Sequence, residues 1–212
     1  MSTEMNEELS GCHKVFAGYR GSLVYGLHDG DSDYDKFEVF VAPKSHYIGL
    51  SEVSITGQKL VGNLDVSTME LRHFCKLVRK QSPTILEWLY TPSYYLNTSL
   101  RPISRVYLSK KLYKPFIGFA SSIANTPKQL SHKVRLLTMC KEALLTGELI
   151  VDRPDKDYLM SIKSGEYKPD VDTLIPKLLS ECERALEVSR LPEDINIGLL
   201  QMECEETILA HW

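Results

Sequence analysis

The sequence predicts an α+β fold in which the strands come first and the second half is helical. Two observations carry this prediction. Short runs of β-branched and aromatic residues, separated by turn residues, occur before residue 67. From residue 67 onward, apolar side chains recur at helical spacing. The 212 residues suit one globular domain with an appendage, or two small domains.

Three segments are predicted to be strands. Residues 14–22 (KVFAGYRGS) form the first and end at Gly21 and Ser22. One or two helical turns are expected over residues 23–27, and a loop over 28–32. The second strand covers residues 33–43 and ends at Pro43. The third covers residues 57–67, with Leu60, Leu64 and Val66 on one face and Asp65 on the other. Residues 1–12 are expected to be a frayed or weakly helical lead.

Helical patterns start at Ser67, which is predicted to form a capping box with Glu70. The apolar stripe of this helix consists of Leu71, Phe74, Cys75 and Val78. A second helix is expected to begin at Ser82-Pro83, followed by irregular chain over residues 91–99. The clearest helix lies between Thr126 and Gly147. Two more are expected at about 171–189 and 194–210.

Composition excludes several classes of function. The net charge of −3 and pI near 6.1 lack the basic excess of proteins that hold long duplexes by counterion release. The five scattered cysteines form no C-x-x-C pair, which predicts reduced, mostly buried thiols in a cytoplasmic protein. The polar N-terminus does not resemble a signal peptide, and no apolar run is long enough to span a bilayer.

An acidic stretch, GSLVYGLHDGDSDYDKF, occupies residues 21–37. Asp33 and Asp35 are two apart in a predicted strand, so their carboxylates leave the same face and can share a divalent cation. The turn at Gly21-Ser22 offers backbone N–H groups to a phosphate. The alternative is a solvated acidic turn. No glutamate closes a twelve-residue EF-hand frame, and a strand rather than a helix follows.

Asp29 and Asp31 flank Gly30 and are expected to be turn residues. Asp65 lies on the polar face of the next predicted strand, and three carboxylates converge if that strand neighbours residues 33–41. Such a site suits phosphoryl or nucleotidyl transfer, because metals stabilise the charge on the attacked phosphate while a carboxylate helps to deprotonate the attacking hydroxyl.

Four blocks resemble, in order, a branch of the DNA polymerase beta-like nucleotidyltransferase superfamily that is associated with RNA repair and has bacterial and phage members. The blocks are RGSLVYGLHDGDSDYDKFEVFVAP, DVSTMELRHFCKLVRKQSPTILEWLY, LSKKLYKPFIGFA and LSHKVRLLTMCKEALLTGEL with IKSGEY. The resemblance covers roughly residues 14–168. The first block, with its G-S…D-x-D signature, is moderately specific, and the ordered set of four is strongly so.

The resemblance implies a small mixed β-sheet core over residues 1–107 and a helical module over 108–212 that covers the active-site cleft. It implies that Gly21 and Ser22 hold a nucleoside triphosphate. Asp33 and Asp35 would bind two Mg²⁺ ions, or Mn²⁺ in their place. Asp65 would be the third carboxylate and help to activate the acceptor hydroxyl. The acceptor would be an RNA end, a nucleotide, a small molecule or a protein side chain.

The resemblance also places the helix at 126–147 near the cleft, so His132, Lys133 and Arg135 are candidate nucleotide contacts. The alternative for these residues is a solvated helix face with a partly buried arginine. Arg20 is expected to be an exposed residue at a strand end, with phosphate contact as the alternative. Tyr94 and Tyr95 either pack or stack on a base.

The chain departs from the branch at three places. Lys36 stands at a commonly apolar position, Glu38 and Val39 replace a glycine, and Ser82 replaces an asparagine. None of these changes removes a predicted ligand. Taken together, however, these departures support a second hypothesis: a non-catalytic nucleotide- or RNA-binding module, antitoxin-like or regulatory, on the same fold.

Overall fold

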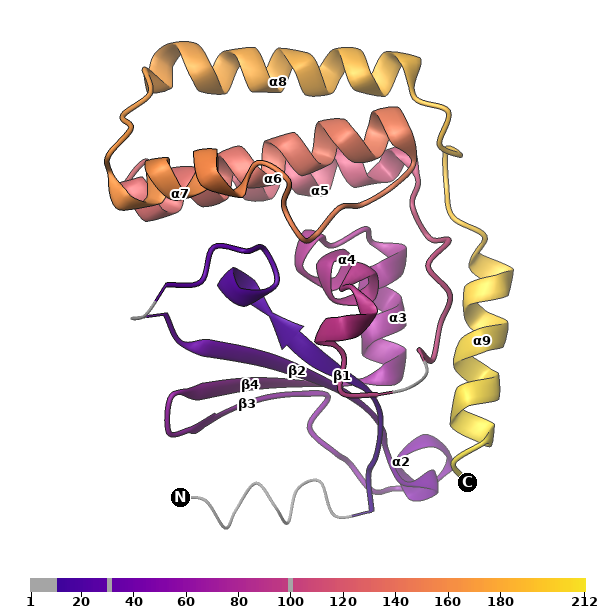
Figure 1. The fold of residues 1–212 in the computed structure, drawn as a ribbon. Helices are drawn as coiled ribbons and strands as arrows, with labels where there is room; N and C mark the ends of the chain where they lie inside the picture. The colour runs from indigo at the N-terminus through magenta and orange to yellow at the C-terminus, as the bar shows by residue number, and fades with distance from the viewer. Residues whose placement is uncertain (1–10, 30–31, 99–100) are drawn as a thin grey trace.

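The computed structural model describes residues 11–29, 32–98 and 101–212. Its strands form one mixed sheet in the order β1-β2-β4-β3 (Figure 1). The strands are β1 (His13–Arg20), β2 (Tyr34–Val41), β3 (Thr56–Val61) and β4 (Leu64–Glu70). The central pair, β2 and β4, is parallel, and both outer pairs are antiparallel. The predicted α+β fold with a small mixed sheet is confirmed.

The described residues also contain eight α-helices and three short 3₁₀ turns. The helices are α2 (Lys44–Ile48), α3 (Leu71–Arg79), α4 (Pro83–Tyr90), α5 (Tyr113–Ser122), α6 (Pro127–Thr146), α7 (Lys156–Ser164), α8 (Val171–Val188) and α9 (Ile197–Leu209). The 3₁₀ turns are η1 (Gly21–Leu23), η2 (Ser93–Tyr95) and η3 (Lys110–Leu112). As Figure 1 shows, α6, α7 and α8 lie above the sheet, whereas α9 runs down beside α3.

One face of the sheet packs on α3 and α4 through aromatic side chains. Phe37 of β2 stacks on Trp88 of α4, with ring centroids 4.9 Å apart and an interplanar angle of 12°. Phe16 and Phe74 join them, and all four rings are buried. The same hydrophobic core continues without a break into the helices after residue 107. The sheet and the helical second half therefore share their buried surface, while the division into two domains stays a prediction.

The single strand expected over residues 57–67 is wrong, because the chain turns back at Gly62 and Asn63 to form the hairpin β3–β4. Gly62 has φ +64°, a left-handed conformation that glycine adopts at little cost. The expected alternation of side chains between two faces assumed one uninterrupted strand, so it does not hold across the turn. The hairpin nevertheless leaves Asp65 on a strand, β4, that pairs with β2.

The helix start expected at Ser67 is also wrong. Residues Ser67 and Thr68 belong to β4, where they pair with β2 on one side and β3 on the other. The helix begins at Leu71, and Glu70 is its N-cap: the carboxylate accepts hydrogen bonds from the backbone N–H groups of Arg72 and His73. Strand pairing on both edges outcompetes a capping box that satisfies only the local chain.

The helical turn expected over residues 23–27 lies earlier, as η1 at Gly21–Leu23, whereas the other helix predictions agree with the structure. Helix α4 begins at Pro83 after Ser82, and α6 begins at Pro127 after Thr126 and ends at Gly147, whose φ is +77°. Helices α8 and α9 correspond to the last two predicted. The expected stripe of α3 is buried. Residues 1–10, part of the expected lead, lie outside the described residues, as do Gly30 and Asp31 of the expected acidic turn.

All five cysteines are free thiols, and four of them are buried, as expected. None of the helices among residues 11–29, 32–98 and 101–212 combines the length and the apolar character needed to cross a membrane.

Candidate active site

The strand register brings three charged residues side by side at one end of the sheet. Strand β1 ends where β2 and β4 begin, because β1 is antiparallel to β2 and β2 is parallel to β4. Arg20 is the register partner of Asp35, and Asp35 is the partner of Asp65. The predicted convergence of Asp35 and Asp65 thus follows from the parallel pairing of two strands that are separated along the chain by α2 and β3.

The guanidinium of Arg20 lies between the two carboxylates. Its Nη2 is 3.3 Å from Oδ1 of Asp35 and 3.2 Å from Oδ2 of Asp65. The same nitrogen donates to Oγ of Ser67 at 3.1 Å, and Nε donates to the carbonyl of Lys36 at 3.2 Å. With 23% of its side chain exposed, Arg20 is not the exposed strand-end residue that was expected. It is the counter-ion of the acidic pair.

Asp65 uses only one of its two oxygens in these contacts. Oδ2 accepts from Arg20 and, at 2.9 Å, from Nε2 of Gln58 on β3. Oδ1 is buried, and no hydrogen-bond partner for it exists among the described residues. A buried acceptor without a partner costs free energy, and an oxygen ligand aimed at a divalent cation would recover it. Together with the carboxylate of Asp35, this atom fits a metal ion.

Burial raises the pKa of Asp35 above its ordinary value, and the neighbouring carboxylates of Asp65 and Asp33 raise it further. Arg20 and, more weakly, Lys128 of α6 act in the opposite direction. Asp33 is exposed and precedes the first residue of β2, so it is not in the strand, although its charge reaches Asp35. The site therefore gathers more negative charge than Arg20 compensates.

Gly21 is fitted closely against Asp35. Its φ is +72°, and a Cβ at this position would lie 2.5 Å from Oδ2 of Asp35. Any side chain would therefore both strain the backbone and displace the carboxylate. The carbonyl of Gly21 accepts from the N–H groups of Val24 and Tyr25, and that of Ser22 accepts from Leu27. These bonds fold the chain into a compact turn, which keeps Gly21 and Ser22 beside the acidic pair.

In the part of the chain that the structure describes, no three histidine, cysteine, aspartate or glutamate side chains are already arranged to hold a metal ion. Arg20 occupies the space between two of the predicted ligands, and Asp33 stands apart at the start of β2. The structure thus shows both carboxylates of the acidic pair in contact with an arginine, whose single charge offsets only part of theirs.

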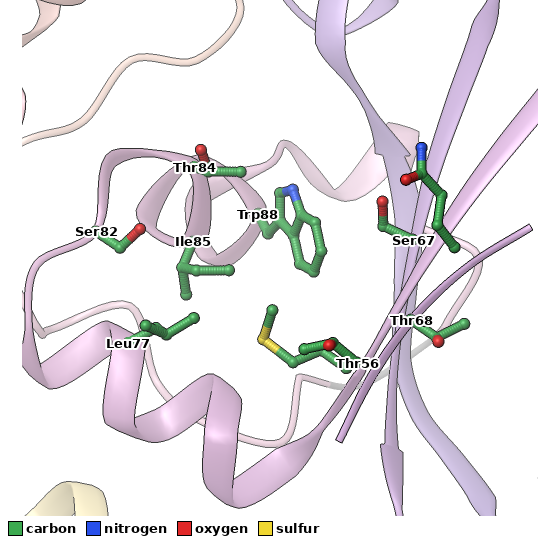
Figure 2. A pocket seen from close by; sticks show the side chains of 11 residues that line it. Thr56, Ser67, Thr68, Leu77, Ser82, Thr84, Ile85 and Trp88 are labelled. Atoms are coloured by element: carbon green, nitrogen blue, oxygen red, sulfur yellow. The ribbon is translucent and has the colours of Figure 1, made fainter. Parts of the chain in front are cut away.

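A groove of about 500 Å³ lies between α4 and the strands β3 and β4 (Figure 2). Gln58 and Ser67, which bond to Asp65 and Arg20, form part of its wall. Trp88 and Ile85 project into it from α4. Its volume is within the range of small-molecule sites, about 300–1,000 Å³.

The loop that follows Ser22 is fastened to the helical module. Nζ of Lys163, on α7, donates to the carbonyl of Leu27 at 2.8 Å and to Oδ2 of Asp29 at 2.7 Å. It also lies 3.4 Å from Oγ of Ser32. Lys163 lies in the IKSGEY block of the family resemblance, but sequence reasoning gave it no role, because the spacing along the chain does not show that it contacts the acidic stretch.

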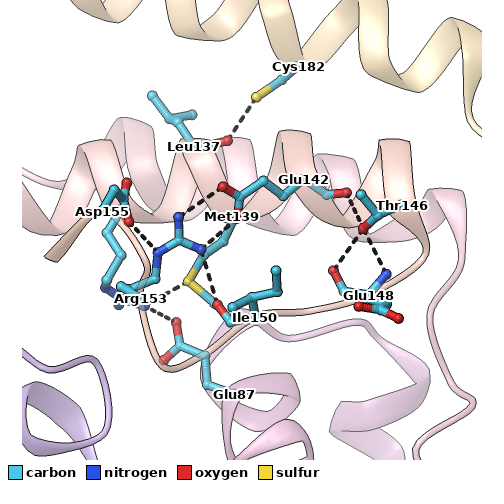
Figure 3. A network of polar contacts seen from close by, with 11 residues as sticks. Glu87, Leu137, Met139, Glu142, Thr146, Glu148, Ile150, Arg153, Asp155 and Cys182 are labelled. Atoms are coloured by element: carbon cyan, nitrogen blue, oxygen red, sulfur yellow. Dashed lines mark hydrogen bonds and ion pairs between the residues drawn. The ribbon is translucent and has the colours of Figure 1, made fainter.

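Of the three candidate nucleotide contacts on α6, Arg135 is the most deeply buried. Its side chain is 1% exposed, bonds to Oε1 of Glu87 at 2.7 Å, and lies 3.6 Å from the ring centroid of Tyr25. Tyr25 in turn donates to the other oxygen of Glu87 at 2.5 Å. Figure 3 shows Glu87 below α6, close to the network in which Arg153 bonds to Glu142 and Asp155.

The other two candidates also have partners in the protein. Nζ of Lys133 donates to Oδ1 of Asn125 at 2.6 Å. His132 packs edge-on against Phe119, with ring centroids 5.6 Å apart, and burial lowers its pKa to about 4. Contact of any of the three with a nucleotide stays a prediction. Tyr94 is exposed, and its hydroxyl bonds to Asp152 at 2.5 Å.

Two similarities to known proteins bear on this site. Residues 3–136 match the family model RlaP, described as the RNA repair pathway DNA polymerase beta family. The chain is also 26% identical over 199 residues to the "Uncharacterized protein YcgL" of Bacillus subtilis (strain 168), an alignment that covers 90% of this chain and 75% of that protein. The matched family region contains the whole sheet, the acidic pair and the first half of α6. The chain therefore belongs to the RNA repair pathway DNA polymerase beta family, a membership that indicates a nucleotidyltransferase-like function.

Proposed function

We propose that the protein is a metal-dependent nucleotidyltransferase that transfers a nucleoside monophosphate from a nucleoside triphosphate to a hydroxyl group, releasing pyrophosphate. The observation that carries this proposal is the approach of Asp35 and Asp65 across the parallel β2–β4 pair, directly against Gly21. A purely structural surface would gain nothing from holding two carboxylates together at the cost of their mutual repulsion.

Each residue of the site has a role in this proposal. Asp35 and Asp65, with Asp33 at the edge, would hold two Mg²⁺ ions, or Mn²⁺. Gly21 and Ser22 would receive the triphosphate. When bound, the metals would supply positive charge to the triphosphate and lower the pKa of the attacking hydroxyl. Arg20 would have to release at least one carboxylate, after which its guanidinium is placed to meet a phosphate oxygen.

The reaction requires one bond to form and one to break. The acceptor oxygen attacks the α-phosphorus, the bond between this phosphorus and the bridging oxygen to the β-phosphate breaks, and pyrophosphate leaves with the bonding electrons. The hydroxyl proton would pass to the carboxylate of Asp65, through the oxygen that does not hold a cation.

A second candidate is a non-catalytic module that binds a nucleotide or an RNA end. The ion pairs of Arg20 favour it, because they engage both carboxylates without a metal ion, as a repurposed site would. The two candidates differ in their dependence on metal. A nucleotidyltransferase needs the carboxylates free for cations, whereas a binding module with Arg20 in place takes up the nucleotide without Mg²⁺.

The test is transfer of label from an NTP carrying ³²P at the α-phosphate, with Mg²⁺ or Mn²⁺, to an oligonucleotide, a nucleoside or a protein hydroxyl. Asp35→Asn and Asp65→Asn are expected to lower the rate of transfer about 100-fold or more, because each removes a charge that the reaction centre needs. Asp157→Asn, which changes an exposed aspartate of α7, is the matched control and should leave the rate unchanged.

Absence of transfer to every acceptor, together with a melting temperature that rises with NTP alone and ignores Mg²⁺, would establish the binding module instead. Full activity in Asp35→Asn or Asp65→Asn would show that the metal site has been assigned to the wrong residues.

A further inference from the structure

The groove beside the acidic pair, called here the neutral groove, has no charged side chain in its wall. Met69, Ile85 and Trp88 provide its apolar surface. Gln58, Ser67 and Ser82 provide amide and hydroxyl groups. Such a wall suits an uncharged ring system with hydrogen-bonding edges, and it offers nothing to neutralise a phosphate.

The neutral groove starts at the reaction centre. Nε2 of Gln58 donates to Oδ2 of Asp65, and Oγ of Ser67 accepts from Arg20, so one group of the groove wall is bonded to the acidic pair and another to its counter-ion. In Figure 2, Ser67 and Trp88 face each other across the end of the groove that is formed by β4. A ligand in the groove can therefore present a hydroxyl group to Asp65.

A second groove, of about 280 Å³, has the opposite character, and we call it the basic groove. Its wall contains His73, Lys76, Arg79 and Lys80 from α3 and the end of that helix, and Lys111 from η3. Lys111 pairs with Asp194, whose pKa is also lowered by Arg79. Lys76 and Lys80 are exposed, and neither has an ion-pair partner among the described residues.

The two grooves border the same residue, Leu77, which contributes to the walls of both. The order from the reaction centre outward is therefore the acidic pair, the neutral groove, Leu77 and the basic groove. This gathering of cations occurs on a protein whose net charge is −3, so it is a local feature and does not reflect an overall basic composition.

We propose that these two grooves are the track for a single-stranded nucleic acid acceptor. The terminal nucleoside occupies the neutral groove with its 3′-hydroxyl toward Asp65, and the phosphates that precede it lie in the basic groove. The sequence of neutral and basic surfaces matches that of an unpaired nucleoside followed by a phosphodiester backbone. The inference rests on the proposed function, since it names the acceptor of that same reaction.

The test uses the full chain and a 5′-labelled twelve-nucleotide single strand with a free 3′-hydroxyl, as RNA in one arm and as DNA in the other. Fluorescence anisotropy at several salt concentrations gives Kd. In the variant Lys76→Glu/Lys80→Glu, Kd is expected to rise about tenfold or more, and the slope of log K against log salt to fall by about 1.4. Lys168→Glu/Lys177→Glu makes the same charge change on exposed lysines elsewhere and should leave both quantities unchanged.

A second variant, Thr56→Tyr, narrows the neutral groove from the exposed edge strand β3. It is expected to raise KM for the oligonucleotide without changing the shift in melting temperature that Mg²⁺ and NTP produce. Binding of RNA, DNA or both supports the track and identifies the sugar that it accepts.

Failure of the wild-type chain to bind either strand, or equal binding by Lys76→Glu/Lys80→Glu and its control, would overturn the inference. Label transfer to a small-molecule hydroxyl with no oligonucleotide binding would refute the nucleic acid track but support the nucleotidyltransferase activity. Oligonucleotide binding through the two lysines with no transfer to any acceptor would support the track but refute the activity.

Discussion

Arg20 and Asp35 show how a single ion pair can be outweighed by its surroundings. The guanidinium lies 3.3 Å from the carboxylate, yet the pKa of Asp35 is raised, because burial and the nearby carboxylates of Asp65 and Asp33 act more strongly than the arginine. A raised pKa means that the folded state holds the proton of Asp35 more tightly than the unfolded chain does. The ionised side chain therefore costs stability at neutral pH.

Asp35→Asn is expected to raise the melting temperature at pH 7 in the absence of metal, because it removes an ionised side chain whose pKa is raised by burial. Protonated Asp35 contributes favourably to the free energy of unfolding at pH values below the pKa that Asp35 has in the unfolded chain. This contribution is lost as the pH rises through the higher pKa that Asp35 has in the folded protein. The difference between variant and wild type should therefore vanish below about pH 4. Thermal unfolding monitored by circular dichroism from pH 3.5 to 7.5 measures it. A lower melting temperature for Asp35→Asn at pH 7 would mean that the pairing with Arg20 dominates.

Three elements that are distant along the chain meet at Glu87 of α4. Tyr25, after the η1 turn, and Arg135 of α6 both bond to its carboxylate, and the guanidinium of Arg135 also covers the ring of Tyr25. Because all three groups are removed from water, each depends on the others for its hydrogen bonds. This cluster fixes α6 against the turn that holds Gly21 and Ser22, and it thereby positions α6 relative to the site.

Arg135→Met is expected to lower the free energy of unfolding by about 3–5 kcal/mol, because it leaves the carboxylate of Glu87 buried without its cation. Adding Glu87→Gln should restore part of the loss, so that the double variant is more stable than the sum of the two single changes predicts. Urea unfolding of the four proteins gives the coupling. Arg184→Met, on the exposed face of α8, is the control and should change stability by less than about 0.5 kcal/mol. If the changes in the free energy of unfolding of the two single variants add up to that of the double variant, Arg135 and Glu87 are not coupled in the way proposed.

On the scale of the whole molecule, the C-terminal helix returns to the sheet layer. Glu203 of α9 accepts hydrogen bonds from the N–H and hydroxyl of Ser104 and, at 2.5 Å, from the hydroxyl of Tyr107. Tyr107 is fully buried, and α9 packs along α3. The last helix thus joins the segment between α4 and α5 to the helix that carries the basic groove.

Glu203→Ala is expected to destabilise the protein by about 1–3 kcal/mol, because the buried hydroxyl of Tyr107 loses its acceptor. The exposed neighbour Glu206→Ala should have little effect. Hydrogen exchange monitored by mass spectrometry is expected to show faster exchange in α9 and in residues 101–108 of Glu203→Ala, with the sheet unchanged. Equal exchange in both variants would show that apolar packing alone holds α9.

Most of the elements could be predicted from the sequence, because their signals are local. Pro83 and Pro127 begin helices, Gly147 ends one, and the stripe of α3 is apolar at helical spacing, all features of the chain within a few residues. The errors at Gly62 and Ser67 have one cause. Whether the segment that contains them turns back or continues depends on which strands are available to pair with it.

The sequence by itself determined the acidic residues and their fit with a family of nucleotidyltransferase-like proteins, because ligand chemistry and motif spacing are written along the chain. Only the tertiary structure decided that Asp35 and Asp65 are neighbours, that Arg20 lies between them, and that a neutral and a basic groove follow each other from this point. These relations depend on strand order and register, which are set by contacts between segments far apart in sequence.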